Sequence, residues 1–264
     1  NLEQPSDGVD VFWVRSFNAY GFRDTETGGR YSEEELAELF PTDGLDIVCF
    51  QEFPTIKQHN YFGTYFRKKT GLQHAHHATT GALAIFSRHP IKNTHTRYFV
   101  RHFNGYQYAD IEVQGKVVRV FNVHLQSNSV SGMATEVARD GNLKDRETWL
   151  NIRGMAANFK RSATKRAEQS EEIARAIAES PHPVIVCGDF NAVPQSYTYH
   201  QISSGLEDSF QEAGTGLGTT YGGTIPALRI DYILHSPALQ ALDCDVRQEP
   251  VSDHYSVTTA LRHR

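Results

Sequence analysis

Eight short apolar segments, each of four to nine residues, recur along the chain. Within them, hydrophobic side chains either alternate with polar ones or follow one another without a break. Segments of this length and pattern are typical of β-strands. They span residues 9–17, 46–50, 82–86, 108–113, 117–125, 184–187, 230–234 and 255–261. The pattern therefore predicts a protein built around β-sheets.

Two amphipathic helices are predicted between these strands. The first begins after Ser32, with Glu35 placed three residues later to complete a capping box. The second covers about residues 162–179, where small and apolar side chains share one narrow stripe. The charged side chains of this helix are predicted to lie on its solvated faces. They are Lys165, Arg166, Glu168, Glu171 and Glu172.

Two stretches have no clear strand or helix pattern. Residues 128–160 are polar and only weakly periodic, so they form a helix, a long surface excursion, or both. Five glycines between Gly214 and Gly223 predict a flexible loop immediately before the strand that carries Asp231.

The composition is that of a folded protein. Of the 264 residues, 39% are hydrophobic and 22% are charged, which is sufficient for a large core. A chain of this length can form one two-sheet domain, so we predict a single domain over residues 1–264. Cys49, Cys187 and Cys244 are widely spaced and odd in number, which indicates buried thiols and no disulfide framework.

The net charge of -5 counts against a non-specific nuclease, because a polyanion is repelled unless a basic face or a metal reverses the local sign. No apolar run approaches the roughly 20 residues that span a bilayer, and the start does not resemble a signal peptide. The chain begins with Asn1, so its localisation is left open, as is a targeting or membrane segment upstream.

Polar residues stand where the predicted strands end, which is where side chains can leave a sheet and meet in a cleft. Any one of them alone is more often a turn residue or a helix cap. Taken together, they form a constellation that suggests chemistry. Its elements are Asn18, Gln51-Glu52, Asn122 with His124, Gly188-Asp189-Phe190-Asn191, Asp231 and Ser252-Asp253-His254.

In this order and setting, these residues resemble the endonuclease/exonuclease/phosphatase superfamily of metal-dependent phosphoesterases. The Gly-Asp-x-Asn and Ser-Asp-His elements carry most of the resemblance, which runs from Asn18 to His254. The superfamily includes deoxyribonucleases, sphingomyelinases and inositol polyphosphate phosphatases. The resemblance implies an α/β four-layer sandwich, in which helices flank two facing, mostly antiparallel β-sheets and the site lies at one edge.

The residues themselves suit phosphoester hydrolysis. Magnesium prefers oxygen ligands and is usually held by one or two carboxylates, which fits Glu52 with help from Asn18 and Asp253, and Mn²⁺ is its expected substitute. Asp189 could accept a proton from the attacking water or orient it, and Asn191 could donate a hydrogen bond to the developing charge on phosphorus oxygens.

His254 is a candidate for phosphate contact or proton exchange, with the Asp231 carboxylate as the group that orients it. The resemblance implies the same pair, and it implies a second phosphate contact from His124. Arg229 lies two positions before Asp231 in the sequence. It either reaches the cleft to bind substrate or forms a surface ion pair.

Two further clusters are conspicuous. His74, His76 and His77 have no carboxylate or cysteine partner nearby, so they are predicted to be solvated loop histidines and not metal ligands. The aromatic residues between Tyr98 and Tyr108 fit a sandwich core better than an aromatic wall for a base or a lipid.

The sequence thus predicts a Mg²⁺-dependent phosphodiesterase or phosphatase. Its substrate is a nucleic acid, a phospholipid head group or an inositol phosphate, and no protein partner is implied. The alternative is a non-catalytic module that binds a phosphate ligand on the same fold.

Overall fold

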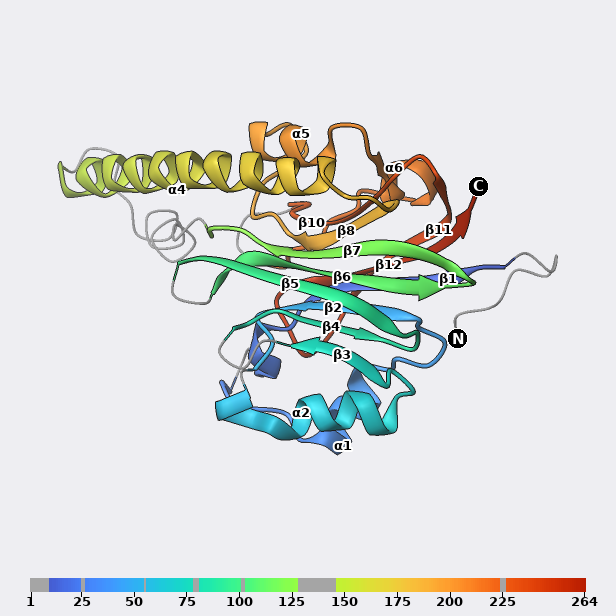
Figure 1. The fold of residues 1–264 in the computed structure, drawn as a ribbon. Helices are drawn as coiled ribbons and strands as arrows, with labels where there is room; N and C mark the ends of the chain where they lie inside the picture. The colour runs from blue at the N-terminus through green and yellow to red at the C-terminus, as the bar shows by residue number, and fades with distance from the viewer. Residues whose placement is uncertain are drawn as a thin grey trace.

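Two six-stranded β-sheets lie face to face at the centre of the protein, with helices on both outer faces (Figure 1). The computed structural model describes residues 10–24, 27–54, 56–77, 81–100, 103–127, 146–223 and 227–264. The predicted four-layer sandwich is therefore confirmed.

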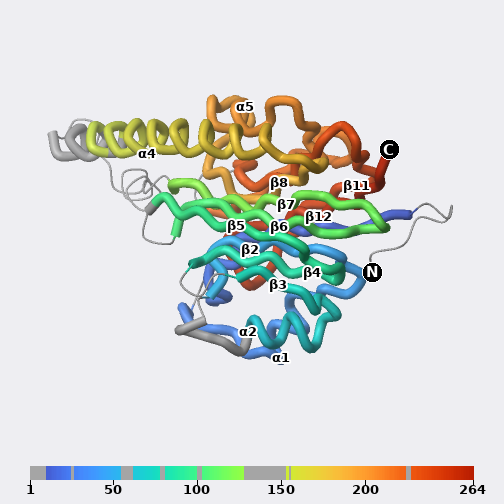
Figure 2. The backbone as a smooth tube through the Cα atoms, viewed as in Figure 1, coloured from blue at the N-terminus to red at the C-terminus, as the bar shows by residue number. Residues whose placement is uncertain are grey.

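The first sheet has, in spatial order, β11 (Leu239–Gln248), β12 (Tyr255–His263), β1 (Phe12–Asn18), β2 (Ile47–Gln51), β4 (Ala84–Ser87) and β3 (His74–His77). The second sheet has β5 (Ile91–Val100), β6 (Asn104–Val113), β7 (Lys116–His124), β8 (Val184–Asp189), β10 (Asp231–His235) and β9 (Glu207–Asp208). Only β1/β2 and β7/β8 pair in parallel among these strands. The first and last strands, β1 and β12, lie side by side in the first sheet (Figure 2).

The helices cover the outer faces of the two sheets. On the first sheet lie η1 (Tyr20–Phe22), α1 (Glu33–Leu39) and α2 (Ile56–Lys69); on the second lie α4 (Arg146–Ala178) and α5 (Tyr197–Ser203). The short helix α6 (Ser209–Ala213) lies at the edge of the sandwich against β10 and β11, where Phe210 and Ala213 pack on the core between the sheets. The capping box predicted for Ser32 and Glu35 is present at the start of α1. The helix predicted from residue 162 begins sixteen residues earlier, at Arg146. Residues 128–145 lie outside the described part of the chain.

The core has three apolar layers, one between the sheets and one on each outer face. Because strand side chains alternate, β1 sends Phe12 and Val14 between the sheets and Trp13 and Phe17 towards the helices. The outer layer of the first sheet is rich in phenylalanine around Phe50, with ring centroids 4.9–6.4 Å from the Phe50 ring. Strands buried on both faces explain the continuous apolar runs in the sequence.

All eight predicted strands are present, and the four that were missed are β3, β5, β9 and β11. The three histidines predicted to lie in a loop are on β3, where all three are half-buried and His76 Nε2 lies 2.7 Å from Thr96 Oγ1. Burial lowers the pKa of His77 to about 4, so that histidine is neutral at pH 7. The three cysteines are buried and free, as predicted.

In the part of the chain that the structure describes, no helix combines the length and the apolar character needed to cross a bilayer.

A buried amide joins the two sheets beside the ends of β2 and β7. The Asn122 side chain of β7 accepts a hydrogen bond from Gln51 Nε2 at 2.7 Å. It also donates to the backbone carbonyls of Phe50, at 2.8 Å, and Ala84, at 3.0 Å. Asn122 and Gln51 are fully buried, so these hydrogen bonds have no competition from water.

Replacement of Asn122 by alanine is expected to lower the free energy of unfolding by about 3 kcal/mol, because a buried amide and two buried carbonyls lose a partner. Chemical denaturation measures the change. The matched control is Gln73→Ala, which removes an exposed side-chain amide and is expected to change stability by less than about 0.5 kcal/mol. Equal effects of the two substitutions would contradict a stabilising role for this bridge.

Candidate active site

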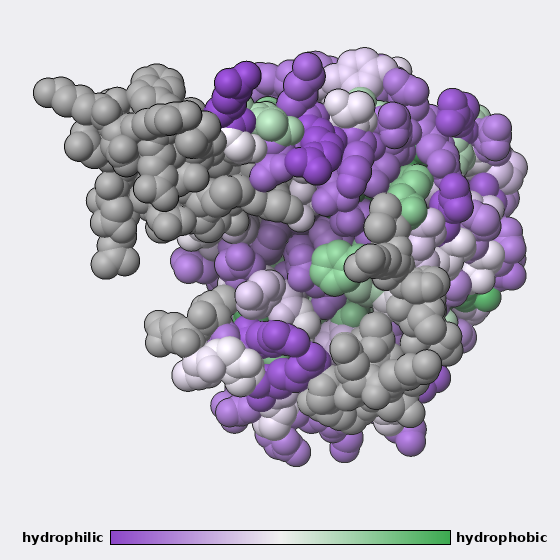
Figure 3. Space-filling view, turned by 90° about the vertical axis from the view of Figure 1, so that its left-hand side faces the viewer, coloured by the Kyte–Doolittle hydropathy of each residue, from purple (hydrophilic) through white to green (hydrophobic). Residues whose placement is uncertain are grey.

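The polar residues predicted from the sequence meet at one end of the sandwich. Strands β1 and β2 run in parallel and finish together, with Asn18 beside Gln51. Strands β7 and β8 likewise finish together, with His124 beside Asp189, and the antiparallel β10 starts with Asp231 beside Asp189. Strand direction thus brings the ends of five strands to one edge. This is the left-hand end in Figure 1, which faces the viewer in Figure 3.

Asn18 connects the two sheets across the site. Its Nδ2 donates to Glu52 Oε1 at 3.3 Å and to Asp189 Oδ2 at 3.1 Å, while its Oδ1 accepts from the Tyr20 backbone at 3.1 Å. The Ser252 hydroxyl donates to the Asn18 carbonyl at 2.8 Å and so attaches the Ser-Asp-His loop to the end of β1. One amide therefore fixes two carboxylates that come from different sheets.

His254 and Asp231 form a buried pair. His254 Nδ1 lies 3.0 Å from Asp231 Oδ2, and His254 Nε2 lies 3.9 Å from Asp189 Oδ2. Burial alone would lower the pKa of His254, but the charges of Asp231 and Asp189 outweigh it and raise the pKa to about 10. The imidazole is therefore a cation that donates through Nδ1 and directs its Nε2–H into the site.

Asp189 and Asn191 form a tight unit at the end of β8. Asp189 Oδ1 accepts from the Asn191 backbone at 2.8 Å, and Oδ2 accepts from Asn191 Nδ2 at 3.1 Å. Asn191 has a φ of 50°, a left-handed conformation that asparagine tolerates better than most residues. Burial, and next the charge of Asp231, raise the pKa of Asp189 to about 6.

His124 lies between the carboxylates. Its Nε2 is 3.7 Å from both Glu52 Oε1 and Asp189 Oδ2, just beyond hydrogen-bonding distance. Burial lowers the pKa of His124, which favours a neutral ring that can donate to or accept from a bound group. Phe103, almost half exposed, packs on this ring with centroids 5.4 Å apart.

Glu52 and Asp253 fit a hard cation better than the other acidic residues of the site. Burial raises the pKa of Glu52, and the charge of Asp253 raises it further. Asp253 Oδ1 is buried without a hydrogen-bond partner among the described residues. Neighbouring carboxylates with an unpaired oxygen suit Mg²⁺. In this geometry the Asn18 amide orients Glu52, while Asn18 Oδ1 already accepts a hydrogen bond from the Tyr20 backbone.

Asp189, Asp231 and His254 also bring three potential ligand atoms within 4.8 Å of one another. However, a histidine binds a metal ion only when its imidazole ring is neutral. The raised pKa of His254 keeps its ring protonated and paired with Asp231. In the structure this trio therefore forms an ion pair of His254 with Asp231, beside the Asp189 carboxylate.

A family model described as the endonuclease/exonuclease/phosphatase family matches residues 16–254, which is most of the chain. The chain belongs to this family.

Solved structures of family-like proteins share the fold at low sequence identity. An endonuclease/exonuclease/phosphatase from Beutenbergia cavernae is 16% identical with a TM-score of 0.69, and the alignment covers 96% of this chain and 72% of that one. A functionally unknown conserved protein from Enterococcus faecalis is 15% identical with a TM-score of 0.70, covering 96% and 100%. Sphingomyelinase C from Streptomyces griseocarneus is 16% identical with a TM-score of 0.62, covering 95% and 99%. No curated protein matches the chain.

The family pattern does not reveal every residue at the site. Tyr221 packs on His254 with ring centroids 5.0 Å apart, and burial followed by the charge of Asp253 raises the pKa of the Tyr221 hydroxyl. Arg166, predicted to be solvated, is only 4% exposed and lies within the electrostatic reach of Asp189. Tyr221 has no signal in the sequence, because the glycine-rich stretch around it predicted only a loop. Arg166 was missed because helical periodicity predicted it on a polar, solvated face.

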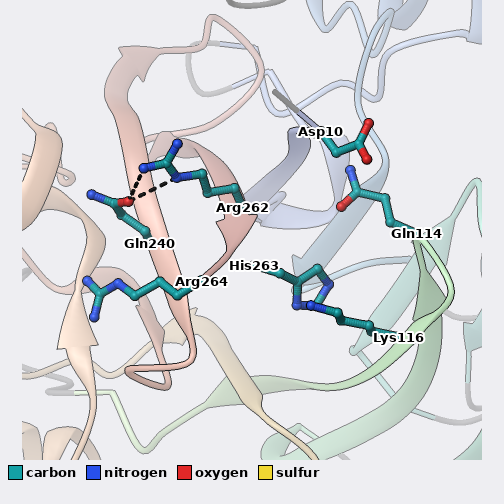
Figure 4. A pocket seen from close by; sticks show the side chains of 7 residues that line it. All are labelled: Asp10, Gln114, Lys116, Gln240, Arg262, His263 and Arg264. Carbon is teal, nitrogen blue, oxygen red and sulfur yellow. Dashed lines mark hydrogen bonds between the residues drawn. The ribbon is translucent and has the colours of Figure 1, made fainter. Parts of the chain in front are cut away.

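A separate cavity of about 540 Å³ lies at the other end of the sandwich (Figure 4). It is lined at the start of β7 by Lys116, whereas His124 at the site ends the same strand. Arg262 also lines this cavity, where its guanidinium donates to Gln240. This basic cavity therefore lies at the opposite end of β7 from the candidate active site.

The structure does not bring Arg229 to this cluster. Its guanidinium donates to both carboxylate oxygens of Asp208, at 3.1 and 2.9 Å, and lies over the rings of Phe210 and Tyr232. The side chains of the pair are 10% and 4% exposed, so this is a buried ion pair, not one at the surface. The geometry gives Arg229 a structural contact in place of the predicted contact with substrate.

Replacement of Arg229 by methionine is therefore expected to lower stability by about 3 kcal/mol, because it leaves Asp208 buried without its cation. Well below the melting temperature, KM for a family substrate should stay within about twofold of wild type. Thermal denaturation and steady-state kinetics measure both. The control Lys92→Ala breaks the more exposed ion pair with Glu112 and should lower the free energy of unfolding by less than about 1 kcal/mol. A large rise in KM with unchanged stability would restore the substrate-binding role.

Proposed function

We propose that this chain is a Mg²⁺-dependent phosphoester hydrolase. The observation that carries the proposal is the His254–Asp231 pair set beside Asp189, with Glu52 and Asp253 grouped close by. Phosphoester hydrolysis needs one group to orient water and another to neutralise charge on the phosphate oxygens. This arrangement offers both within one buried site.

Each side chain has a role that its contacts support. His254 presents its Nε2–H to a non-bridging phosphate oxygen while Asp231 holds the ring. Asp189, fixed by Asn18 and Asn191, orients the attacking water and takes its proton. His124 supplies a hydrogen bond to the phosphate as charge develops. Both N–H groups of the Asn191 amide donate to Asp189 and Leu125, so Asn191 contributes a further hydrogen bond to the phosphate by exchanging one of these partners. Bound by Glu52 and Asp253, with Asn18 holding Glu52 in place, Mg²⁺ would supply the remaining neutralisation of charge.

Two substrate classes fit this chemistry, and the balance of charge favours one. A net charge of -5 disfavours a long polyanion and is compatible with a single phospholipid or inositol phosphate head group. The fold is shared with a sphingomyelinase. We therefore favour a head-group substrate over a nucleic acid, and both belong in the assay.

Purified protein is expected to hydrolyse one member of a panel of sphingomyelin, inositol phosphates, plasmid DNA and single-stranded oligonucleotides, with Mg²⁺ and not with EDTA. His254→Ala and Asp189→Asn should each lower kcat by at least about 100-fold, because each removes a group that acts in the transition state. Lys165→Ala, on the exposed face of α4, is the matched control and should behave as wild type. Tight binding of a phosphate ligand without turnover would instead support a non-catalytic module.

Metal binding can be tested without turnover. Mg²⁺ or Mn²⁺ at one hundred times its Kd should stabilise the fold by about 2.7 kcal/mol, seen as a higher melting temperature. Glu52→Gln and Asp253→Asn should each remove most of this shift, whereas the exposed Asp245→Asn should keep it. A shift that persists in both site variants would place the metal elsewhere.

A further inference from the structure

Two residues of α4 hold the backbone that follows β7. Gln169 Oε1 accepts from the Gln126 backbone N–H at 3.0 Å, and Arg166 Nη1 donates to the Gln126 carbonyl at 2.9 Å. Arg166 and Gln169 are three positions apart on one face of the helix, and each is at most 5% exposed. Both polar groups of a single backbone residue, just beyond His124, are therefore fixed from one helix.

The same short stretch is attached to the candidate active site. The Leu125 N–H donates to the Asp189 carbonyl at 3.0 Å, and Asn191 Nδ2 donates to the Leu125 carbonyl at 3.2 Å. His124 immediately precedes Leu125. A shift of Gln126 would therefore move a phosphate-contacting histidine and loosen the partner of Asn191.

Arg166 also carries an unusual charge for its position. Its guanidinium is buried, its hydrogen bond goes to a carbonyl, and no salt bridge to it occurs within the described ranges. Burying a cation without a carboxylate partner is costly, so a compensating interaction is expected. The Arg166 guanidinium lies over the Phe159 ring, 6.0 Å from its centroid, and the negative charge of Asp189 also acts on it.

The positive charge of Arg166 offsets part of the negative charge of the site. Four carboxyl groups, those of Glu52, Asp189, Asp231 and Asp253, face one protonated imidazole. An anionic phosphoester entering this site meets net negative charge even with a divalent cation bound. A fixed guanidinium within electrostatic reach of Asp189 lowers that repulsion.

We propose that Arg166 is a positioning residue which, with Gln169, clamps Gln126 and thereby holds His124 and Asn191 in the geometry that receives the phosphate. The inference rests on the proposed function and deepens it. The guanidinium acts through its hydrogen bond to Gln126 and through its charge near Asp189, without needing to touch the substrate.

Three substitutions separate this role from simple packing. Arg166→Met keeps the length and apolar stem of the side chain but removes its charge and its donors. Loss of the clamp should lower kcat about 100-fold, while loss of the charge should raise KM by less than about threefold. Arg166→Lys keeps a cation and a donor, and should recover at least about tenfold of that loss. Lys165→Met makes the same change on the exposed neighbour and should leave kcat unchanged.

Amide hydrogen exchange provides a readout that needs no substrate. In Arg166→Met and in Gln169→Met, the Gln126 and Leu125 amides should exchange at least about tenfold faster than in wild type, while the amides of β1 keep their rates. If Arg166→Met does not fold, the exchange rates of the Gln126 and Leu125 amides in Gln169→Met are compared with those in Arg166→Lys and in wild type.

The outcomes are distinguishable. Wild-type kcat in Arg166→Met, or unchanged exchange at Gln126, overturns the clamp while leaving the hydrolase proposal intact. Equal kcat values for Arg166→Met and Arg166→Lys would show that the charge and the donors of Arg166 do not matter, and would reduce Arg166 to a packing residue. If wild type hydrolyses no phosphoester, the proposed function fails, and the exchange rate at Gln126 alone decides whether the clamp exists.

Discussion

The hydrogen bonds of the Asn122 side chain fix how the two sheets sit relative to each other at the end that carries the candidate site. Hydrophobic contacts between the sheets are non-directional and would permit small displacements of one sheet along the other. The amide bridge to Gln51 and to the Phe50 carbonyl removes that freedom one residue before Glu52 and two before His124. The 3.7 Å separation of those two site residues depends on it.

The site itself balances burial against charge. Each carboxyl group loses hydration, and the raised pKa of Asp189 and of Glu52 is the direct result. What keeps the cluster folded is a set of donors from several elements, of which the amide of Asn18 and the imidazolium of His254 are the most central. Such an arrangement is most favourable when positive charge is added, which fits a cation and conflicts with a purely structural role.

The sequence predicted the central strands, and the meeting of polar side chains at one edge of the sheets, because both follow from local rules. Strands buried on two faces read as continuous apolar runs, and polar residues at their ends converge once the parallel pairs are fixed. Edge strands such as β3 and β11 were missed because their exposed faces are polar. Arg166 and Arg229 were misplaced for another reason: their positions depend on Gln126 and Asp208, which are distant in sequence and have no local signature.

Glu52 has a φ of 51°, a left-handed backbone in which a side chain crowds its own carbonyl. Glycine would adopt this conformation with little strain, yet the position carries the carboxylate that we propose as a metal ligand. Evolution at this position is therefore constrained by two opposed demands, one for a relaxed turn and one for a negative charge. A search for stabilised variants would tend to replace Glu52, so under the proposed function thermal tolerance gained here would be accompanied by lost activity.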